Sequence, residues 1–250
     1  MRGTINALNQ EDAVAELQAL GSDVAGEVLA DALNHTGNQA RQLLRAGMDQ
    51  AFDRPSSWVK NSIYMQNATP TEPVVALWIK DGKLGGKGRG FDEWFNPQVE
   101  GGERLNKGSE KMLREIGVLP AGRFIVPAAG ARLDGNGGIS RGHMTQILSG
   151  LRAFGMAGSD HNATGSRRSS RQGHANAFFV MKRGRTPIGI AERRGQRVQM
   201  VLAFVRQPQY RERFRFYDIV RRVAEDDALI ETNIDLAVVK ALSKRRGRGR

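Results

Sequence analysis

The sequence contains no cysteine among its 250 residues. This absence excludes a disulfide framework, a thiolate nucleophile and a metal site with cysteine ligands. No window approaches the roughly 20 apolar residues that a membrane helix needs. The segment that begins at Met1 also has no apolar core of signal-peptide length. From these absences we expect a protein that folds in a cytosol and has no membrane partner.

Phosphate-loop and calcium-loop motifs are incomplete. The stretch Gly82–Gly90 is rich in glycine and follows an apolar segment, but Lys87 is followed by glycine rather than by Ser or Thr, and no helix opens after the stretch. Asp134–Gly138 resembles the beginning of a calcium loop, but Thr145 occupies the twelfth position, where a bidentate Glu is required. We therefore interpret the two stretches as a flexible loop and a turn.

The usual catalytic patterns are missing as well. The four histidines form no metal-binding spacing, and no serine lies in a G-x-S-x-G elbow. A Ser-His-Asp site stays open at this point, because its members meet only in the fold. We expect no catalytic residue, no cofactor and no metal, and hence no enzyme.

One aromatic cluster, Phe91–Phe95, has two interpretations. It places Asp92 and Glu93 between aromatic rings, an environment that raises a carboxyl pKa as an acid catalyst requires. Aromatic side chains also concentrate at interfaces, so the cluster is more typical of an anchor to a core or to a neighbouring subunit. The candidate assembly anchors from this cluster are Phe91, Trp94 and Phe95.

The chain carries an excess of positive charge. Its 38 Lys and Arg against 26 Asp and Glu give a formal net charge of +12. This balance indicates a polyanionic partner or an acidic protein partner, and charge alone does not separate the two. Flexible Arg-rich segments bind phosphate backbones by counterion release, without base specificity. The candidate contacts in a polar loop and at the chain end are Arg167, Arg168, Arg171, Lys244, Arg245, Arg246, Arg248 and Arg250.

The strongest strand pattern lies at Ala177–Val205, where glycine-containing breaks separate three short segments. Such breaks join antiparallel neighbours, so the pattern predicts a β-meander. The third segment is apolar on both faces, which favours a central strand or an interface. Val201 and Val205, on the same face of it, are therefore added to the candidate assembly anchors. The expected strands are 177–183, 187–193 and 197–205.

The region before the meander begins with a predicted helical arm, Gln10–Phe52. Its many small residues permit close approach of a neighbouring helix, and the His-Thr-Gly sequence at 35–37 predicts a bend or break. Two strands are expected next, followed by a long Gly-rich insertion that holds two short helices and a strand. The ranges are 57–66 and 74–80 for the strands, about 82–173 for the insertion, 109–116 and a segment capped by Ser140 for the helices, and 123–126 for the inner strand.

Two helices, 209–224 and 228–242, are predicted after the meander, and we expect them to cover part of its apolar surface. The last residues, 244–250, are too charged and too rich in glycine to pack. The predicted class is α+β. The predicted domains are a helical arm 1–55, an α+β domain 56–243 with the insertion, and a basic tail 244–250.

Two stretches carry a resemblance to a known family. ALNHTGNQARQLLR in the arm and AFFVMKRGRTPIGIAERRGQRVQMVLAFVRQPQYRERFRFYDIVRR from Ala177 onward resemble the minor tail and tail-completion proteins of tailed phages, including lambdoid phages. Shared features are an alanine-rich helical start, basic linkers, a strand pair with a glycine-arginine turn, and a terminal helix. The resemblance covers about a third of the chain, and the long insertion departs from it.

The resemblance implies a structural, non-enzymatic virion protein at the head–tail junction or upper tail, assembled in the host cytoplasm. Its implied partners are copies of itself in a ring, the portal or connector, and tail-tube or terminator proteins, with double-stranded DNA in the channel. The alternative that the charge supports is a basic DNA-binding or packaging accessory protein.

Overall fold

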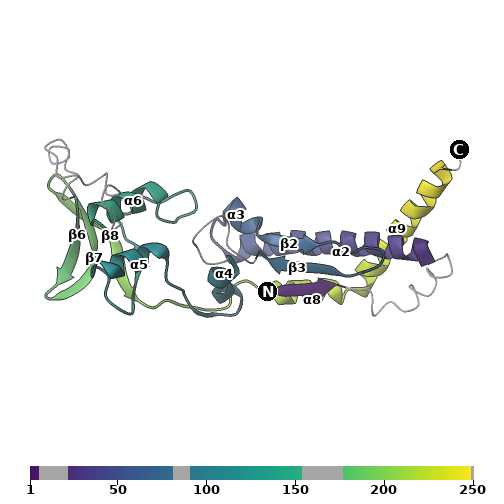
Figure 1. Ribbon diagram of the computed structural model, residues 1–250, viewed down its shortest axis with the longest axis horizontal. Helices are drawn as coiled ribbons and strands as arrows, with labels where there is room; N and C mark the ends of the chain where they lie inside the picture. Colours follow the sequence, from purple (N-terminus) through teal and green to yellow (C-terminus); the bar gives the residue numbers. More distant parts are fainter. Residues whose placement is uncertain (6–21, 81–90, 154–176, 249–250) are drawn as a thin grey trace. The chain divides into compact units, whose positions relative to one another are not determined.

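The computed structural model describes residues 1–5, 22–80, 91–153 and 177–248. It contains helices and antiparallel strands (Figure 1), which confirms the predicted α+β class. The chain divides into two compact units. Unit 1 consists of residues 1–101 and 211–250, and unit 2 is Gly102–Tyr210. This division differs from the predicted boundaries at 55 and 243, because the helix of the predicted arm packs within unit 1.

Unit 1 is built on a three-stranded antiparallel sheet of order β1-β3-β2, in which Arg2 of the first strand pairs with Trp78. One face of the long helix α2 packs on this sheet together with Phe214 and α8. The elements are β1 (Arg2–Ile5), α2 (Ser22–Ala51), α3 (Ser57–Lys60), β2 (Ile63–Gln66), β3 (Val75–Ile79), α4 (Phe91–Val99), α8 (Phe216–Ala224) and α9 (Asp227–Arg248).

Helix α2 is continuous from Ser22 to Ala51, so a break at 35–37 is wrong. The Thr36 hydroxyl donates to the carbonyl oxygen one turn earlier (3.0 Å) and accepts from the Asn233 side-chain amide (2.8 Å). Gly37 lies against β3, where an added Cβ would stand 2.6 Å from Val75 Cγ1. Both residues therefore contact neighbouring elements rather than ending the helix.

The opposite face of α2 packs against α9. Small and branched residues of α2, such as Ala25 and Ala32, meet Ile230 and Ile234 in one buried cluster. This contact confirms that the small residues allow a second helix to approach closely. Both termini of the chain thus contribute to unit 1.

The predicted strand 57–66 is extended only at Ile63–Gln66, and residues 57–60 form the single turn α3. The Ser56 hydroxyl accepts a hydrogen bond from the backbone N–H of Val59 (3.3 Å). A serine that caps in this way offers the backbone a helical turn in place of a strand ladder.

Helix α9 is longer than the predicted 228–242, and its backbone continues to Arg248. Residues 244–248, predicted to lie beyond the helix as a basic tail, therefore have a helical backbone, and residues 249–250 lie outside the described part. Lysine and arginine are good helix formers. Positive charge near a helix C-terminus also interacts favourably with the helix dipole.

Unit 2 contains the predicted β-meander, which is confirmed. Its four-stranded antiparallel sheet has the order β5-β8-β7-β6. Gly184 and Gly195 take positive φ angles of 60° and 59° in the two turns, as the sequence predicts for glycine there. The elements are β4 (Gly102–Glu103), α5 (Gly108–Glu115), β5 (Arg123–Pro127), α6 (Arg141–Gly150), β6 (Phe178–Arg183), β7 (Thr186–Arg194), β8 (Arg197–Arg206) and β9 (Gln209–Tyr210).

Strand β8 is central, as predicted, because it pairs with both β5 and β7. Helices α5 and α6 lie on the same side of the sheet (Figure 1), and Leu113 and Ile147 pack there against Leu202 and Phe204. The expectation that the two C-terminal helices cover the meander is wrong. The apolar face of α8, including Val220, is buried in the core of unit 1 instead.

Candidate functional site

The predicted polyanion contacts fall mainly outside what the structure describes. Arg167, Arg168, Arg171 and Arg250 lie outside the described residues. The other four belong to the last turns of α9, where only Lys244 has a described side chain, which is exposed. The remaining three of this set are Arg245, Arg246 and Arg248.

The predicted aromatic anchors belong to α4, and the side chains of Phe91 and Trp94 are outside the described part. Phe95 is buried and meets Phe52 and Phe214 edge-on or nearly so, with ring centroids 5.6 and 5.8 Å apart. Of the two expected kinds of anchor, to a core or to a neighbouring subunit, Phe95 is therefore an anchor to the core of unit 1.

The two predicted anchors of the meander have different positions. Val201 is fully buried in the core of unit 2 and presents no surface to another chain. The register of β7 and β8 shifts beside it, so that Leu202 pairs with Ile190 while Val201 has no partner in register. Val205 is half-buried on β8 and pairs with Phe124 of β5. Of the two, only Val205 remains accessible.

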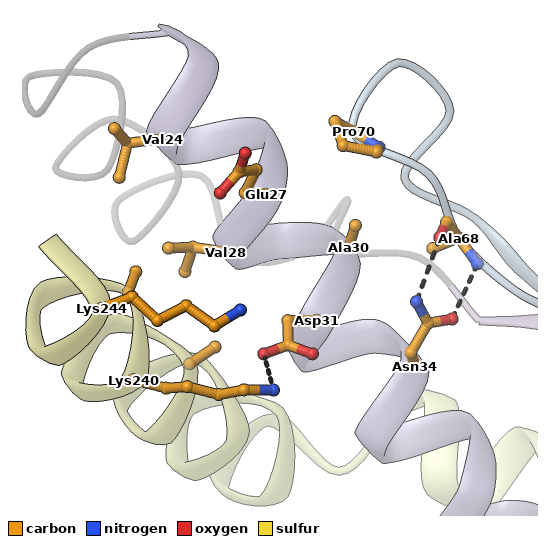
Figure 2. Close-up of a pocket in the computed structure, with 12 residues that line it drawn as sticks. Val24, Glu27, Val28, Ala30, Asp31, Asn34, Ala68, Pro70, Lys240 and Lys244 are labelled. Carbon is orange, nitrogen blue, oxygen red and sulfur yellow. Dashed lines mark hydrogen bonds and ion pairs between the residues drawn. The ribbon is translucent and has the colours of Figure 1, made fainter. Parts of the chain in front are cut away.

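A groove of about 820 Å³ runs between α2 and α9 in unit 1 (Figure 2). Two of its polar side chains are exposed charges, Glu27 and Lys244, and the others already have partners: Lys240 Nζ donates to Asp31 (2.6 Å), and the Asn34 side chain exchanges two hydrogen bonds with the backbone of Ala68 (3.0 and 2.8 Å). Ligand sites usually present convergent polar groups that await a partner. The groove therefore makes a weak candidate for a small-molecule site.

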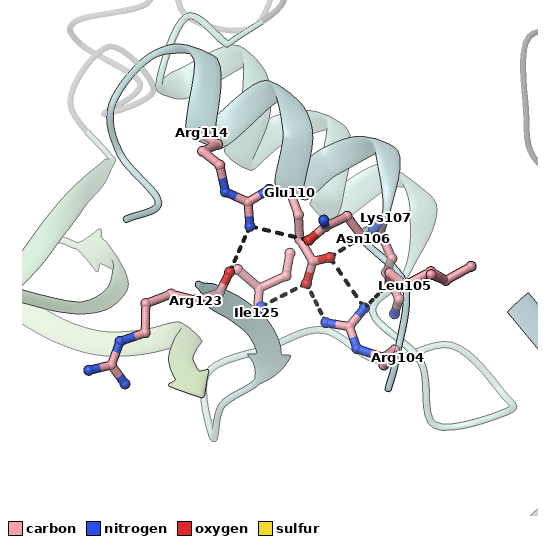
Figure 3. A network of polar contacts seen from close by, with 8 residues as sticks. All are labelled: Arg104, Leu105, Asn106, Lys107, Glu110, Arg114, Arg123 and Ile125. Atoms are coloured by element: carbon pink, nitrogen blue, oxygen red, sulfur yellow. Dashed lines mark hydrogen bonds and ion pairs between the residues drawn. The ribbon is translucent and has the colours of Figure 1, made fainter. Parts of the chain in front are cut away.

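A fully buried carboxylate, Glu110, organises the polar network in unit 2 (Figure 3). It accepts hydrogen bonds from the backbone N–H groups of Lys107 (2.7 Å) and Ile125 (2.9 Å), and it forms a two-point ion pair with Arg104. The Arg104 guanidinium also lies over the Phe124 ring, 4.8 Å from its centroid. Since the carboxylate is saturated with donors, it joins α5 to β5 rather than acting as an acid or base.

A second buried group, His143 on α6, lies beside a carboxylate of β7. Its Nδ1 accepts from the backbone N–H of Arg132 (2.9 Å), so the neutral ring carries its proton on Nε2. Nε2 is 3.6 Å from Glu192 Oε2 and has no hydrogen-bond partner among the described residues. Burial lowers the pKa of His143, and Arg132 and Arg194 lower it further, against the opposing effect of Glu192.

Sequence reasoning missed this pair. His143 and Glu192 come from elements far apart in the chain, and spacing rules detect only neighbours in sequence. The one available signal was a carboxylate at the end of an otherwise apolar strand. A histidine–carboxylate pair is one part of a nucleophilic site, in which the ring nitrogen opposite the carboxylate takes the proton of a hydroxyl. In His143 that nitrogen is Nδ1, which already accepts from the backbone N–H of Arg132.

The most exposed apolar surface in the described part lies on α9. Leu236, Val239 and Leu242 are 58%, 66% and 47% exposed, respectively. Their spacing of three residues places them on one side of the helix, while Ile230 and Ile234 pack toward α2. We call these three side chains the α9 stripe.

The described residues contain no group of three or more His, Asp or Glu placed to hold a metal ion. No described helix is long and apolar enough to span a membrane. The chain matches no protein-family model, and neither the curated proteins nor the solved structures include a match. The resemblance to phage tail proteins therefore stays a prediction.

Proposed function

We propose that this chain is a non-enzymatic structural protein of a phage virion, in which copies assemble into a ring at the head–tail junction or upper tail. The two segments that carry the resemblance, 32–45 and 177–222, belong to ordered elements in both units: α2, the meander and α8. The proposed neighbours are the portal or connector and the tail-tube or terminator proteins.

The α9 stripe is the observation that carries this proposal. A helix whose one face is buried normally directs charged residues to solvent on the other. Here α9 buries one face against α2 and still exposes Leu236, Val239 and Leu242 on another. Contiguous exposed apolar side chains of this kind mark interaction sites, and covering them with a neighbouring copy removes them from water.

A ring needs two different surfaces on each subunit, because only a head-to-tail contact generates a closed cycle of more than two. The sheet of unit 2 offers a second surface. The face opposite α5 and α6 carries half-buried apolar residues on three strands, beside Phe124, which is buried under the Arg104 guanidinium. Examples are Val126, Phe179, Ala203 and Val205.

Analytical ultracentrifugation tests the assembly. The wild-type chain is expected to sediment as an oligomer, and Val239→Glu is expected to sediment as a smaller species, because a charge replaces the centre of the α9 stripe. Leu43→Glu is the matched control, since Leu43 is an exposed (49%) leucine on α2 of the same unit. A monomeric wild type at every concentration would refute assembly through α9.

The location requires a separate measurement. Mass spectrometry and electron microscopy of purified virions are expected to detect the chain at the neck or upper tail. Particles that lack it would contradict a virion role, even if the isolated chain forms rings.

A further inference from the structure

The net positive charge of the chain belongs entirely to unit 2. Residues 102–210 contain 18 Lys and Arg against six Asp and Glu, so unit 2 has a formal charge of +12. The remaining residues, which form unit 1, contain 20 of each and are neutral. The excess in the whole chain therefore equals the excess in unit 2.

Within unit 2, five basic residues lie at one end of the four-stranded sheet, and Arg193, Arg194 and Arg197 lie at the other. Arg123 of β5 pairs directly with Arg206 of β8, and Arg183 of β6 pairs with Thr186 at the start of β7. Antiparallel pairing places the start of β7 beside the end of β8, since Gly189 pairs with Ala203 further along. Lys182 and Arg185 flank the same β6–β7 turn. We call Arg123, Lys182, Arg183, Arg185 and Arg206 the basic row.

The positive charges of the basic row are not neutralised by carboxylates of unit 2 in the part of the chain that the structure describes. None of its members forms an ion pair with a carboxylate among the described residues. Like charges directly opposite each other in a sheet are destabilising, as at Arg123 and Arg206. All members are exposed except Arg123, which is half-buried. An anion that binds across the strands would relieve this repulsion.

The residue types favour phosphate. Four of the five side chains are arginine, whose planar guanidinium binds phosphate oxygens at two points. Protein interfaces usually need a desolvated apolar centre, and the row includes no exposed large apolar side chain. A phosphodiester backbone requires only the charges.

We propose that the basic row binds the phosphate backbone of nucleic acid without base specificity. Unit 2 is then the nucleic-acid-binding part of the chain, whereas the α9 stripe of unit 1 is a surface for self-assembly. The contact does not depend on the proposed ring, because all five side chains belong to one copy of unit 2.

Fluorescence anisotropy with a labelled mixed-sequence DNA duplex tests the site, over KCl concentrations from about 50 to about 300 mM. The triple variant Arg183→Gln/Arg185→Gln/Arg206→Gln is compared with Arg211→Gln/Arg213→Gln/Arg222→Gln. The control removes the same charge from exposed positions of unit 1. Circular dichroism and thermal melting verify that both variants fold.

The row variant is expected to bind the duplex about tenfold or more weakly than the wild type. The slope of log affinity against log salt concentration is expected to be smaller in magnitude by about 2 to 3, because each lost phosphate contact lowers it by about 0.9. The control is expected to retain the wild-type slope. Equal losses of DNA affinity in the row variant and the control, or no binding by the wild type at about 50 mM KCl, would overturn the assignment of the basic row to nucleic acid.

Two further measurements identify the ligand class and separate binding from assembly. Competition with polyglutamate is expected to be much weaker than with unlabelled DNA of equal charge. Equal competition would assign the row to acidic proteins and refute the nucleic-acid proposal. Val239→Glu is expected to bind DNA with the wild-type salt slope even as a monomer, so that failure of the ring leaves this result intact.

Discussion

Glu110 shows how a single buried charge is tolerated in unit 2. A buried carboxylate is unfavourable unless donors replace its water. The ion pair with Arg104 and the two backbone N–H groups of Lys107 and Ile125 provide that replacement. The same contacts join the start of α5 to β5 and to the segment that precedes the helix.

Replacing Glu110 with Ala is expected to lower the free energy of unfolding of unit 2 by about 3–5 kcal/mol, because Arg104 and two N–H groups lose their acceptor. Urea titration followed by circular dichroism measures the change. Glu115→Ala, at the exposed end of the same helix, is expected to change it by less than about 0.5 kcal/mol. Similar values for the two variants would contradict a central stabilising role of Glu110.

At the scale of elements, Gly37 illustrates a sequence signal with the wrong interpretation. A glycine within a helical pattern usually predicts that the helix breaks there, because glycine lowers helix stability by about 1 kcal/mol relative to alanine. In α2 the missing side chain lets the helix approach β3, with Val75 and Met65 too near for a Cβ. The packing advantage offsets the loss in propensity, and the helix continues.

Gly37→Ala is therefore expected to destabilise unit 1 by about 1–3 kcal/mol through overpacking, despite the higher helix propensity of alanine. Gly142→Ala is the matched control, because Gly142 lies in α6 with no atom near the added Cβ, and this change is expected to be neutral or stabilising. Adding Val75→Ala to Gly37→Ala is expected to recover part of the loss. Thermal unfolding of the variants checks all three expectations. Stabilisation by Gly37→Ala alone would show that the close approach is not limiting.

At the scale of the whole molecule, the described cores are separate. Leu44 belongs to the cluster around α2, β3 and α8, and Leu202 to the cluster around α5, α6 and the meander. The neutral and basic compositions follow the same division. Each unit therefore has its own source of stability, and under the proposals above only unit 2 binds nucleic acid.

Leu202→Ala is expected to reduce amide protection by about 2–5 kcal/mol in the unit 2 strands and to leave unit 1 largely unchanged, because the cavity forms in one core only. Leu44→Ala should produce the reverse pattern. Hydrogen–deuterium exchange with mass spectrometry measures the protection of each unit separately. Loss of protection throughout the chain in either variant would mean that the units unfold as one.

Local features of the fold were predictable from the sequence. The meander depends on neighbouring apolar segments and on Gly184 and Gly195 at its turns. The cap of α6 depends on the Ser140 hydroxyl, which accepts from the His143 N–H. These features need only residues close in sequence, so pattern and turn chemistry suffice. The total charge and the lack of cysteine are likewise properties of composition.

Only the tertiary structure decided how distant segments combine. It buried α8 in the core of unit 1 rather than on the meander, placed Glu192 beside His143, and brought Arg123 next to Arg206. It also assigned the whole positive excess to unit 2. Such partnerships depend on shape complementarity and register across the chain. The absence of cysteine was plain from the sequence, whereas the uncompensated arginines became visible only once the strands were paired.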